Sequence, residues 1–374
     1  MRPRHSALVV SLIVVSACAP LTAVREPDEI AGAEPTLAGS GINHATVAEA
    51  FITARTPLDN IDSPASWTSP EGKVWLFATA KEGKGLVLYD GDTGATLRGV
   101  GTVGTGAGQF QRPNGVAVSG DLLFVVERDN RRVQVLSLPG LASLATFGER
   151  ELQQPYGLWV RELAGGERDV LVTDAYMAGT DARGDSIVPP LARLDKRIHR
   201  YRVRTDGSAV VAELGGTHGD ITEAGAIRIP ESLWGDPAHD RLLVSEEDTV
   251  TGTAVREYSL SGEYRGRTIG LGQFKAQAEG IALWTCPDGS GYWLATDQFK
   301  DRSLFHVYDR QTLAPLGAFA GNTVANTDGV WLHQAATSRF PQGVFYAVHD
   351  DMAVAAFDWR DVASALSLRA DCDG

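Results

Sequence analysis

The chain has 374 residues, of which 43% are apolar, and it contains 41 Gly, 17 Pro and 8 Trp. This length is sufficient for a large core in one big β-domain or in two ordinary domains, and the many turn-forming and aromatic residues are typical of all-β proteins. The formal net charge of −13 argues against nucleic acid as a partner, because binding a phosphate backbone requires clustered Lys and Arg.

The first 18 residues are predicted to be a lipoprotein signal peptide. A basic start is followed by an apolar run over residues 7–15, which is too short for a comfortable membrane span, and "VSAC" ends at Cys18 in the manner of a lipobox. Cleavage there would leave Cys18 lipidated and anchor the protein outside the cytoplasm, on the membrane of the bacterial cell envelope. The alternative is an ordinary secretory signal cleaved nearby. Residues 19–42 are rich in Pro, Gly, Ala and acids, and are predicted to be a flexible tether.

Residues 43–374 are predicted to form a six-bladed β-propeller with four-stranded antiparallel blades. One order of strands and turns recurs about every 40–50 residues, with one longer gap, and this period is typical of propeller blades. The repeated units are 63–100, 112–148, 154–216, 229–270, 278–320 and 327–359. Residues 43–55 are expected to add a strand that closes the ring onto the last blade. The alternative is an open β-sandwich, and "DWRDVASALSL" is the only helical candidate.

A polar residue precedes the first strand of each unit. These residues are Asp62, Arg112, Tyr156, Glu231, Glu279 and Asp328. Because the innermost strands of a propeller surround its axis, radial repetition brings these side chains toward one opening. Four carboxylates there cannot all be ionised without a cation or basic groups among them, and oxygen ligands favour calcium or magnesium over zinc. The set therefore predicts a site, although any one acid alone would be interpreted as a strand-end cap.

Two cysteines remain besides Cys18. Cys286 and Cys372 could pair in an oxidising compartment, and their separation gives no metal-ligand spacing. The eight His include no i,i+4 pair around an acid, so the sequence has no helical zinc motif, and no Ser lies in a Gly-x-Ser-x-Gly elbow.

Five segments carry a resemblance to a known family. They are "DNIDSPASW", "FATAKEGKGLVLYD", "ESLWGDPAHDRLLVSEED", "EGIALW…DGSGYWLATDQ…FHVYDR" and "NTDGVWLH…FPQGVFYAVHDD". In this order, over residues 59–360, they resemble the β-propeller phytases, calcium-dependent phosphatases that act on inositol phosphates. "GTGAGQFQRPNGVAV" is also similar to an NHL-repeat blade, so a general six-bladed propeller of that kind is an alternative.

The resemblance implies a monomeric, calcium-dependent phosphomonoester hydrolase and assigns its residues. The implied calcium ligands are Asp62, Glu231, Glu247, Glu279 and Asp328, with Glu231 and Glu279 required for catalysis. The implied substrate-binding residues are Lys81, Arg112, Arg128 and Tyr156. In such a site bridged calcium ions acidify a water for attack at phosphorus, while Lys and Arg compensate the developing charge.

Several positions depart from the family's pattern. Ser63 replaces the second Asp of the signature, Ser232 replaces a Gly, "DAY" at 174–176 replaces a Lys-Glu pair, and "FITARTP" lacks the family's acid. The insertion 177–200 is interpreted as a solvated loop, or else its basic residues replace the lost Lys; they are Arg193, Lys196, Arg197 and Arg200. The departures leave a second function open, in which a non-catalytic propeller binds a ligand, a glycan or a protein partner at the cell envelope and holds a structural calcium.

Overall fold

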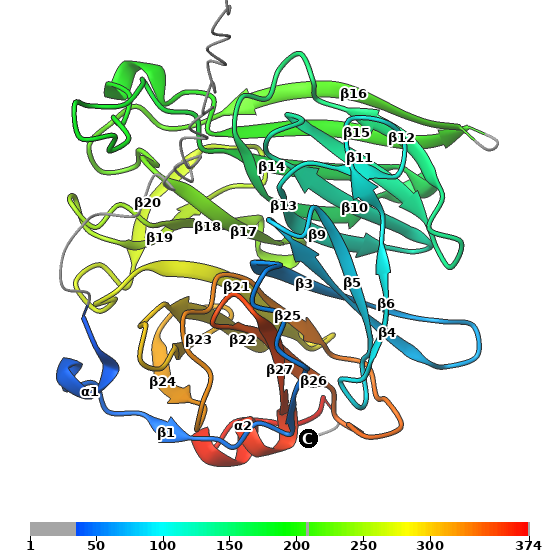
Figure 1. Cartoon of the computed structure of the whole chain (residues 1–374). Helices are drawn as coiled ribbons and strands as arrows, with labels where there is room; N and C mark the ends of the chain where they lie inside the picture. Colours follow the sequence, from blue (N-terminus) through cyan, green and yellow to red (C-terminus); the bar gives the residue numbers. More distant parts are fainter. Residues whose placement is uncertain (1–34, 207–208, 373–374) are drawn as a thin grey trace, which may run out of the picture.

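The computed structural model describes residues 35–206 and 209–372. All of its strands except a short pair between blades 1 and 2 form six sheets around one axis (Figure 1). The predicted six-bladed β-propeller is thereby confirmed, and each predicted unit agrees with its blade to within three residues at either end. The predicted signal peptide, its Cys18 and residues 19–34 lie outside the described residues. Within the described ranges, no helix is long and apolar enough to cross a membrane.

Each blade takes its strands in chain order, from the innermost strand outward. Blade 1 contains β3 (Ile61–Thr68), β4 (Val74–Ala80), β5 (Gly85–Asp90) and β6 (Thr96–Val100). Blade 2 contains β9 (Pro113–Ser119), β10 (Leu122–Glu127), β11 (Arg132–Ser137) and β12 (Ser143–Phe147). Blade 3 contains β13 (Pro155–Glu162), β14 (Arg168–Asp174), β15 (Ile198–Asp206) and β16 (Ala209–His218).

The second half of the ring repeats this order with two additions. Blade 4 contains β17 (Pro230–Asp236), β18 (Arg241–Glu246), β19 (Ala254–Tyr258) and β20 (Tyr264–Ile269). Blade 5 contains β21 (Ala278–Thr285), β22 (Gly291–Asp297), β23 (Leu304–Asp309) and β24 (Pro315–Ala320), with β1 (Ala45–Thr46) added in parallel to β24. Blade 6 contains β25 (Val330–His333), β26 (Val344–His349), β27 (Ala353–Asp358) and β2 (Phe51–Ile52).

The apolar sequence of the inner strands follows from their place between neighbouring blades. In β10, "LLFVVE", every residue is buried, and β26, "VFYAVH", is buried throughout as well. A strand packed on both faces needs no polar alternation. The outermost strand β12 alternates between half-buried and exposed positions before its buried last residue, because its blade ends there at solvent.

The N-terminal segment closes the ring, as predicted. β2 pairs antiparallel with β27 of the last blade, so the two ends of the chain share one sheet. Residues 35–42 differ from the predicted flexible tether. Leu37 in the short helix α1 (Leu37–Ser40) is buried in an apolar cluster with Phe299, and its N–H donates to Asp301 at 2.7 Å. Leu37, with Ile42 packed against the same cluster, therefore attaches the segment to blade 5.

The remaining elements are short. β7 (Thr102–Val103) and β8 (Gln109–Phe110) pair in the connection between blades 1 and 2, and the 3-10 turns are η1 (Ala164–Gly166), η2 (Leu191–Arg193) and η3 (Pro237–His239). The predicted C-terminal helix is confirmed as α2 (Trp359–Leu366), whose buried Trp359 stacks on Trp284 at 5.5 Å. A disulfide joins Cys286 to Cys372, so the cysteines that could pair do so.

Candidate metal and anion site at the propeller axis

The six polar residues found before the repeated strands form a first ring around the axis. The structure places Asp62, Tyr156, Glu231 and Glu279 as second residues of their strands rather than before them, while Arg112 and Asp328 do precede theirs. In these four strands the register shifts directly at the ring residue, as between Pro230 and Leu233. A β-bulge changes the direction of a side chain, so the same irregularity recurs where the functional side chains leave the strands.

Small residues after the ring positions let adjacent blades touch. A Cβ added to Gly157 would lie 2.6 Å from the carbonyl oxygen of Glu231 in the next blade, and one on Gly329 would lie 2.6 Å from that of Asp62. The N–H of Gly329 donates to this Asp62 carbonyl at 2.9 Å. The main chain of a ring residue is therefore fixed by its neighbouring blade, and the direction of its side chain is fixed with it.

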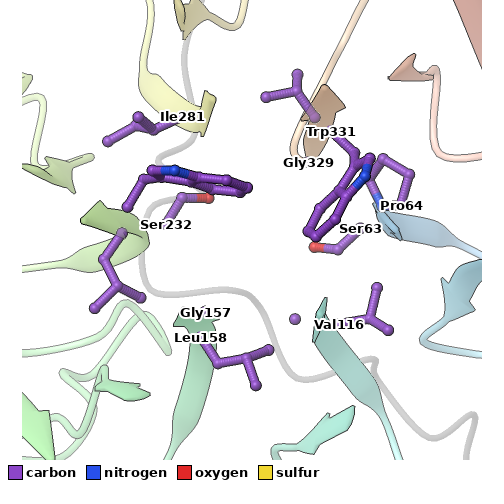
Figure 2. A pocket seen from close by; sticks show the side chains of 13 residues that line it. Ser63, Pro64, Val116, Gly157, Leu158, Ser232, Ile281, Gly329 and Trp331 are labelled. Carbon is purple, nitrogen blue, oxygen red and sulfur yellow. The ribbon is translucent and has the colours of Figure 1, made fainter. Parts of the chain in front are cut away.

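A narrow channel continues along the axis beside these small residues. Figure 2 shows Ser63, Gly157, Ser232 and Gly329 around it, on strands that converge from different blades. The channel holds about 40 Å³, and the indoles of Trp234 and Trp331 meet in it edge to face at 5.4 Å. This space suits one or two waters, which excludes the channel itself as the site of an organic ligand.

The residue that follows the second strand forms a second ring in the first five blades. Its members are Lys81, Arg128, Ala175, Glu247 and Gln298. In blade 6 the equivalent Asp350 is partly exposed and pairs with Arg55 instead, and the next residue, Asp351, interacts with Asp328. The main-chain N–H groups of Lys81, Glu247 and Gln298 each donate to the loop before the inner strand, at 2.8, 3.1 and 2.9 Å. Gln298 was not predicted as a site residue, although aligning the repeats makes it equivalent to Lys81.

A buried acid ends the second strand in four blades, and it supports the ring rather than joining it. Asp297 accepts the N–H groups of Lys275 and Ala276 at 2.9 and 2.8 Å, and Glu246 accepts those of Arg228 and Ile229 at 2.7 and 2.9 Å. Glu127 and Asp174 do the same in blades 2 and 3. These carboxylates hold the loops that lead into the inner strands.

Three glutamates of blades 4 and 5 meet beside the axis. Glu231, Glu247 and Glu279 each place a carboxylate oxygen within 4.8 Å of the other two, and they are 2%, 6% and 4% exposed. One oxygen of Glu231, Oε2, is buried without a hydrogen-bond partner. Burial, followed by the charge of Glu279, raises the pKa of Glu231 well above its ordinary value. This crowding of oxygens is suited to a hard divalent cation.

The other two predicted metal-binding acids do not join this group. Lys81 bridges them, with Nζ 2.9 Å from Asp62 Oδ1 and 3.2 Å from Asp328 Oδ2, and it also donates to the hydroxyl of Tyr156 at 3.4 Å. Burial alone would lower the pKa of Lys81, but the charges of Asp62, Tyr156 and Asp328 raise it well above the ordinary value. The expected five-acid cluster is therefore a triad and a separate Lys-bridged pair.

The Lys-bridged pair has further partners that the sequence did not indicate. Gln298 donates to Asp328, and Lys300 donates to Gln298 at 3.1 Å. Burial, and then the charge of Asp328, raises the pKa of Asp351 to about 7. Asp351 is the second acid of "HDD" after β26, and only its tertiary position distinguishes it from an ordinary turn residue.

The basic side of the site is formed by blades 1 and 2. Arg112 pairs with Glu82 at 2.6 Å and Arg128 with Asp129 at 2.8 Å, and the arginine side chains are 10% and 15% exposed. Burial, and then the charge of Arg128, lowers the pKa of Arg112. The rings thus carry cations on blades 1 and 2 and the glutamate triad on blades 4 and 5.

Two of the four basic residues of the insertion are engaged within the fold. Arg197 is fully buried and donates to four main-chain carbonyls, those of Asp174, Tyr176, Ile227 and Arg228. Arg200 pairs with Asp169 at 2.6 Å, while Arg193 and Lys196 are exposed. The alternative in which Arg197 and Arg200 replace the lost Lys is therefore not supported, because their donors are used within the fold.

The fold and these side chains define a six-bladed β-propeller with a charged axial site. No family model and no curated protein matches the chain. Among solved structures it is similar to the hydrazine synthase of Kuenenia stuttgartiensis, with 14% identity and a TM-score of 0.45 over 79% of this chain and 75% of that one. It is also similar to a nidogen/laminin complex, with 12% identity and a TM-score of 0.42 over 71% and 82%. At this level neither similarity indicates a family or a function.

Proposed function

We propose that the protein is a calcium-dependent phosphomonoester hydrolase that acts on inositol phosphates at its axial site. The observation that carries this proposal is the buried triad of Glu231, Glu247 and Glu279, which belongs to the same two rings as Arg112 and Arg128. A cation held by the triad and a phosphate held by the arginines would each compensate the other's charge. The phytase resemblance of the sequence supports the same assignment.

The residues present fit calcium better than a softer metal. Three carboxylates offer up to six oxygens, calcium takes about six to eight, and water or substrate oxygens would complete the set. The unpartnered Oε2 of Glu231 is an open ligand position. When bound, calcium would supply the positive charge that acidifies a water and offsets the charge of the phosphate.

The side chains of blades 1 and 2 would have different roles in binding the phosphate. Arg112 and Arg128 would donate to phosphoryl oxygens, since guanidinium groups match oxyanions in geometry. Lys81 is already balanced by Asp62 and Asp328, so its role is to bridge these two acids and hold them in place. In the hydrolysis, a water oxygen forms the new bond to phosphorus, the ester bond breaks, and the leaving inositol oxygen takes up a proton.

A second candidate function is a propeller that binds a ligand or protein partner and holds a structural calcium. The neutralised Lys81 favours it, because a phosphate clamp with no spare charge binds substrate weakly. So does the insertion, whose buried Arg197 cannot replace the missing Lys.

Phosphate release from inositol hexakisphosphate, measured during a calcium titration of residues 35–374, decides between the two functions. We expect activity with calcium, abolished in Glu231→Gln and Glu279→Gln, and a raised KM with little change in kcat in Arg128→Ala. Glu71→Gln, on an exposed turn, is the matched control. Calcium-induced thermal stabilisation without phosphate release would favour the binding propeller, and absence of both would contradict both functions.

We further propose that the protein works as a monomer outside the cytoplasm, anchored through lipidated Cys18. The disulfide between Cys286 and Cys372 supports an oxidising location. Cys18→Ser should move the full-length protein from the membrane fraction to the soluble fraction. Equal membrane retention of the variant and the wild type would contradict the anchor.

A further inference from the structure

A second pocket lies on blade 4, apart from the axial rings. It has a volume of about 310 Å³ and lies between the outer strands β19 and β20 and the loop before β17. Its polar lining includes Arg228, Arg256, Tyr264 and Thr268. This volume is at the lower end of the range for small-molecule sites.

Arg256 brings a buried positive charge to this pocket. The residue is 4% exposed, and its Nη1 donates to Thr268 Oγ1 at 2.9 Å and to the carbonyl of Ala224 at 3.3 Å. Its Nε is buried without a hydrogen-bond partner. Among residues 35–206 and 209–372, no carboxylate forms an ion pair with Arg256. Its charge acts on the buried Glu246, but that carboxylate is already occupied by main-chain N–H groups.

A buried guanidinium without a paired anion is unfavourable, because protein interiors solvate charge poorly. Such groups are normally compensated by a carboxylate or by a bound anion. The pocket gives an anion access to Arg256, since Arg256 is one of the residues that line it.

The rim of the pocket carries a second arginine in a replaceable contact. Arg228 pairs with Glu223 at 2.5 Å, and the side chain of Glu223 is 81% exposed. Arg228 itself is 8% exposed, so only the carboxylate of this ion pair lies in solvent, where water can replace it. An entering anion can therefore compete with Glu223 for Arg228 and interact with both arginines.

The pocket wall next to Arg256 leaves room for an organic group. Tyr264 is held by a hydrogen bond of 3.1 Å between its hydroxyl and Thr268 Oγ1. A Cβ added at Gly266, between these two residues, would meet no atom within 4 Å. Leu271 at the edge is 56% exposed. The pocket thus combines two guanidinium groups with an aromatic ring and open space.

We propose that this pocket binds a small organic oxyanion, a carboxylate or a phosphate monoester, with Arg256 as its buried anchor and Arg228 closing on it from the rim. The shared chemistry is an oxyanion that accepts parallel hydrogen bonds from guanidinium groups. This site is independent of the axial calcium site.

Isothermal titration of calcium-free protein with benzoate and with inorganic phosphate tests the proposal, and the two arms distinguish carboxylate from phosphate recognition. We expect Arg256→Gln to weaken binding by about tenfold or more, because charged hydrogen bonds are lost. Glu223→Gln should strengthen it by roughly two- to fivefold, because the competing carboxylate is removed. Lys73→Gln, at an exposed loop residue outside both sites, should leave it unchanged. A binding component that persists in Arg256→Gln and is lost in Arg128→Gln would belong to the axial site instead of this pocket.

Ala224→Trp provides a variant that keeps both arginines. Ala224 is an exposed residue of the pocket wall, so a bulky side chain there should fill the pocket and block binding while the fold persists. This variant decides the matter if Arg256→Gln does not fold. Absence of binding of either anion at tens of millimolar, or binding unchanged in Ala224→Trp, would overturn the proposal.

Discussion

Glu231 combines two properties that are unfavourable for an ionised carboxyl group. It is 2% exposed, and this burial raises its pKa. The charges of Glu279, Asp62 and Asp328 raise the pKa of Glu231 further. Its pKa is therefore raised, which means that the folded protein holds this proton more tightly than the unfolded chain. Without calcium, the free energy of unfolding should thus fall as pH rises from the ordinary carboxyl range toward the raised pKa.

Glu231→Gln should change stability in opposite directions with and without calcium. In calcium-free protein at neutral pH the variant should melt at a higher temperature than the wild type, because an amide removes the buried repulsion and its pH dependence. Calcium should stabilise the wild type by mass action and the variant much less. Thermal unfolding between pH 5 and 8, with Glu71→Gln as the control, measures both effects. An equal calcium-induced shift in Glu231→Gln and the wild type would contradict its role as a ligand.

At the scale of the strand, the bulge and the small residue after it decide where each ring side chain lies. Gly157 lies so close to the main chain of Glu231 in the next blade that a side chain at this position would clash with it. A glycine is therefore needed here for the contact between blades. The φ angle of Gly157 is not positive, so a substitution would cause a steric clash with the next blade but no backbone strain.

Gly157→Ala should destabilise the protein by about 1–3 kcal/mol, as overpacking of a tight contact does. It should also weaken calcium binding, because the main chain of Glu231 must shift. Gly99→Ala is the matched control, since Gly99 is also a strand glycine without positive φ and its Cβ would meet no atom within 4 Å. Chemical denaturation and calcium titration of both variants test this. Equal stability of the two variants would show that the contact is not limiting.

At the scale of the whole molecule, the two ends of the chain complete the ring. β2 supplies the outer strand of blade 6, and the Cys286–Cys372 disulfide fastens the segment after α2 to blade 5. The disulfide spans 86 residues of sequence, so it restricts the unfolded chain substantially.

Replacing both cysteines with Ser should lower the melting temperature, because loop closure of this length corresponds to about 4–5 kcal/mol in the chain-entropy model. Reductant should have the same effect on the wild type and none on the double variant. Thermal unfolding combined with mass spectrometry of the thiols checks this. A wild type that is fully reduced yet melts at the same temperature would contradict a stabilising role.

The sequence alone determined the propeller, because each blade repeats the same apolar runs and turns and the inner strands are apolar on both faces. It also indicated the ring residues, since equivalent positions in a radial repeat must approach one axis. The close agreement between the predicted units and the observed blades has this cause.

Only the tertiary structure decided which charged side chains lie close together. Glu231, Glu247 and Glu279 meet while Asp62 and Asp328 meet Lys81 instead, and this division depends on the order of blades around the axis and the reach of each side chain. Arg197 resembled a phosphate ligand in sequence, yet its donors bind main-chain carbonyls. Leu37 attaches the N-terminal segment because it packs on Phe299, which is distant in the sequence. Arg256 is a candidate anion ligand because the fold buries it at a pocket. Sequence spacing fixes a residue's place along its strand, whereas the charge and solvent around it come from segments that only folding brings together.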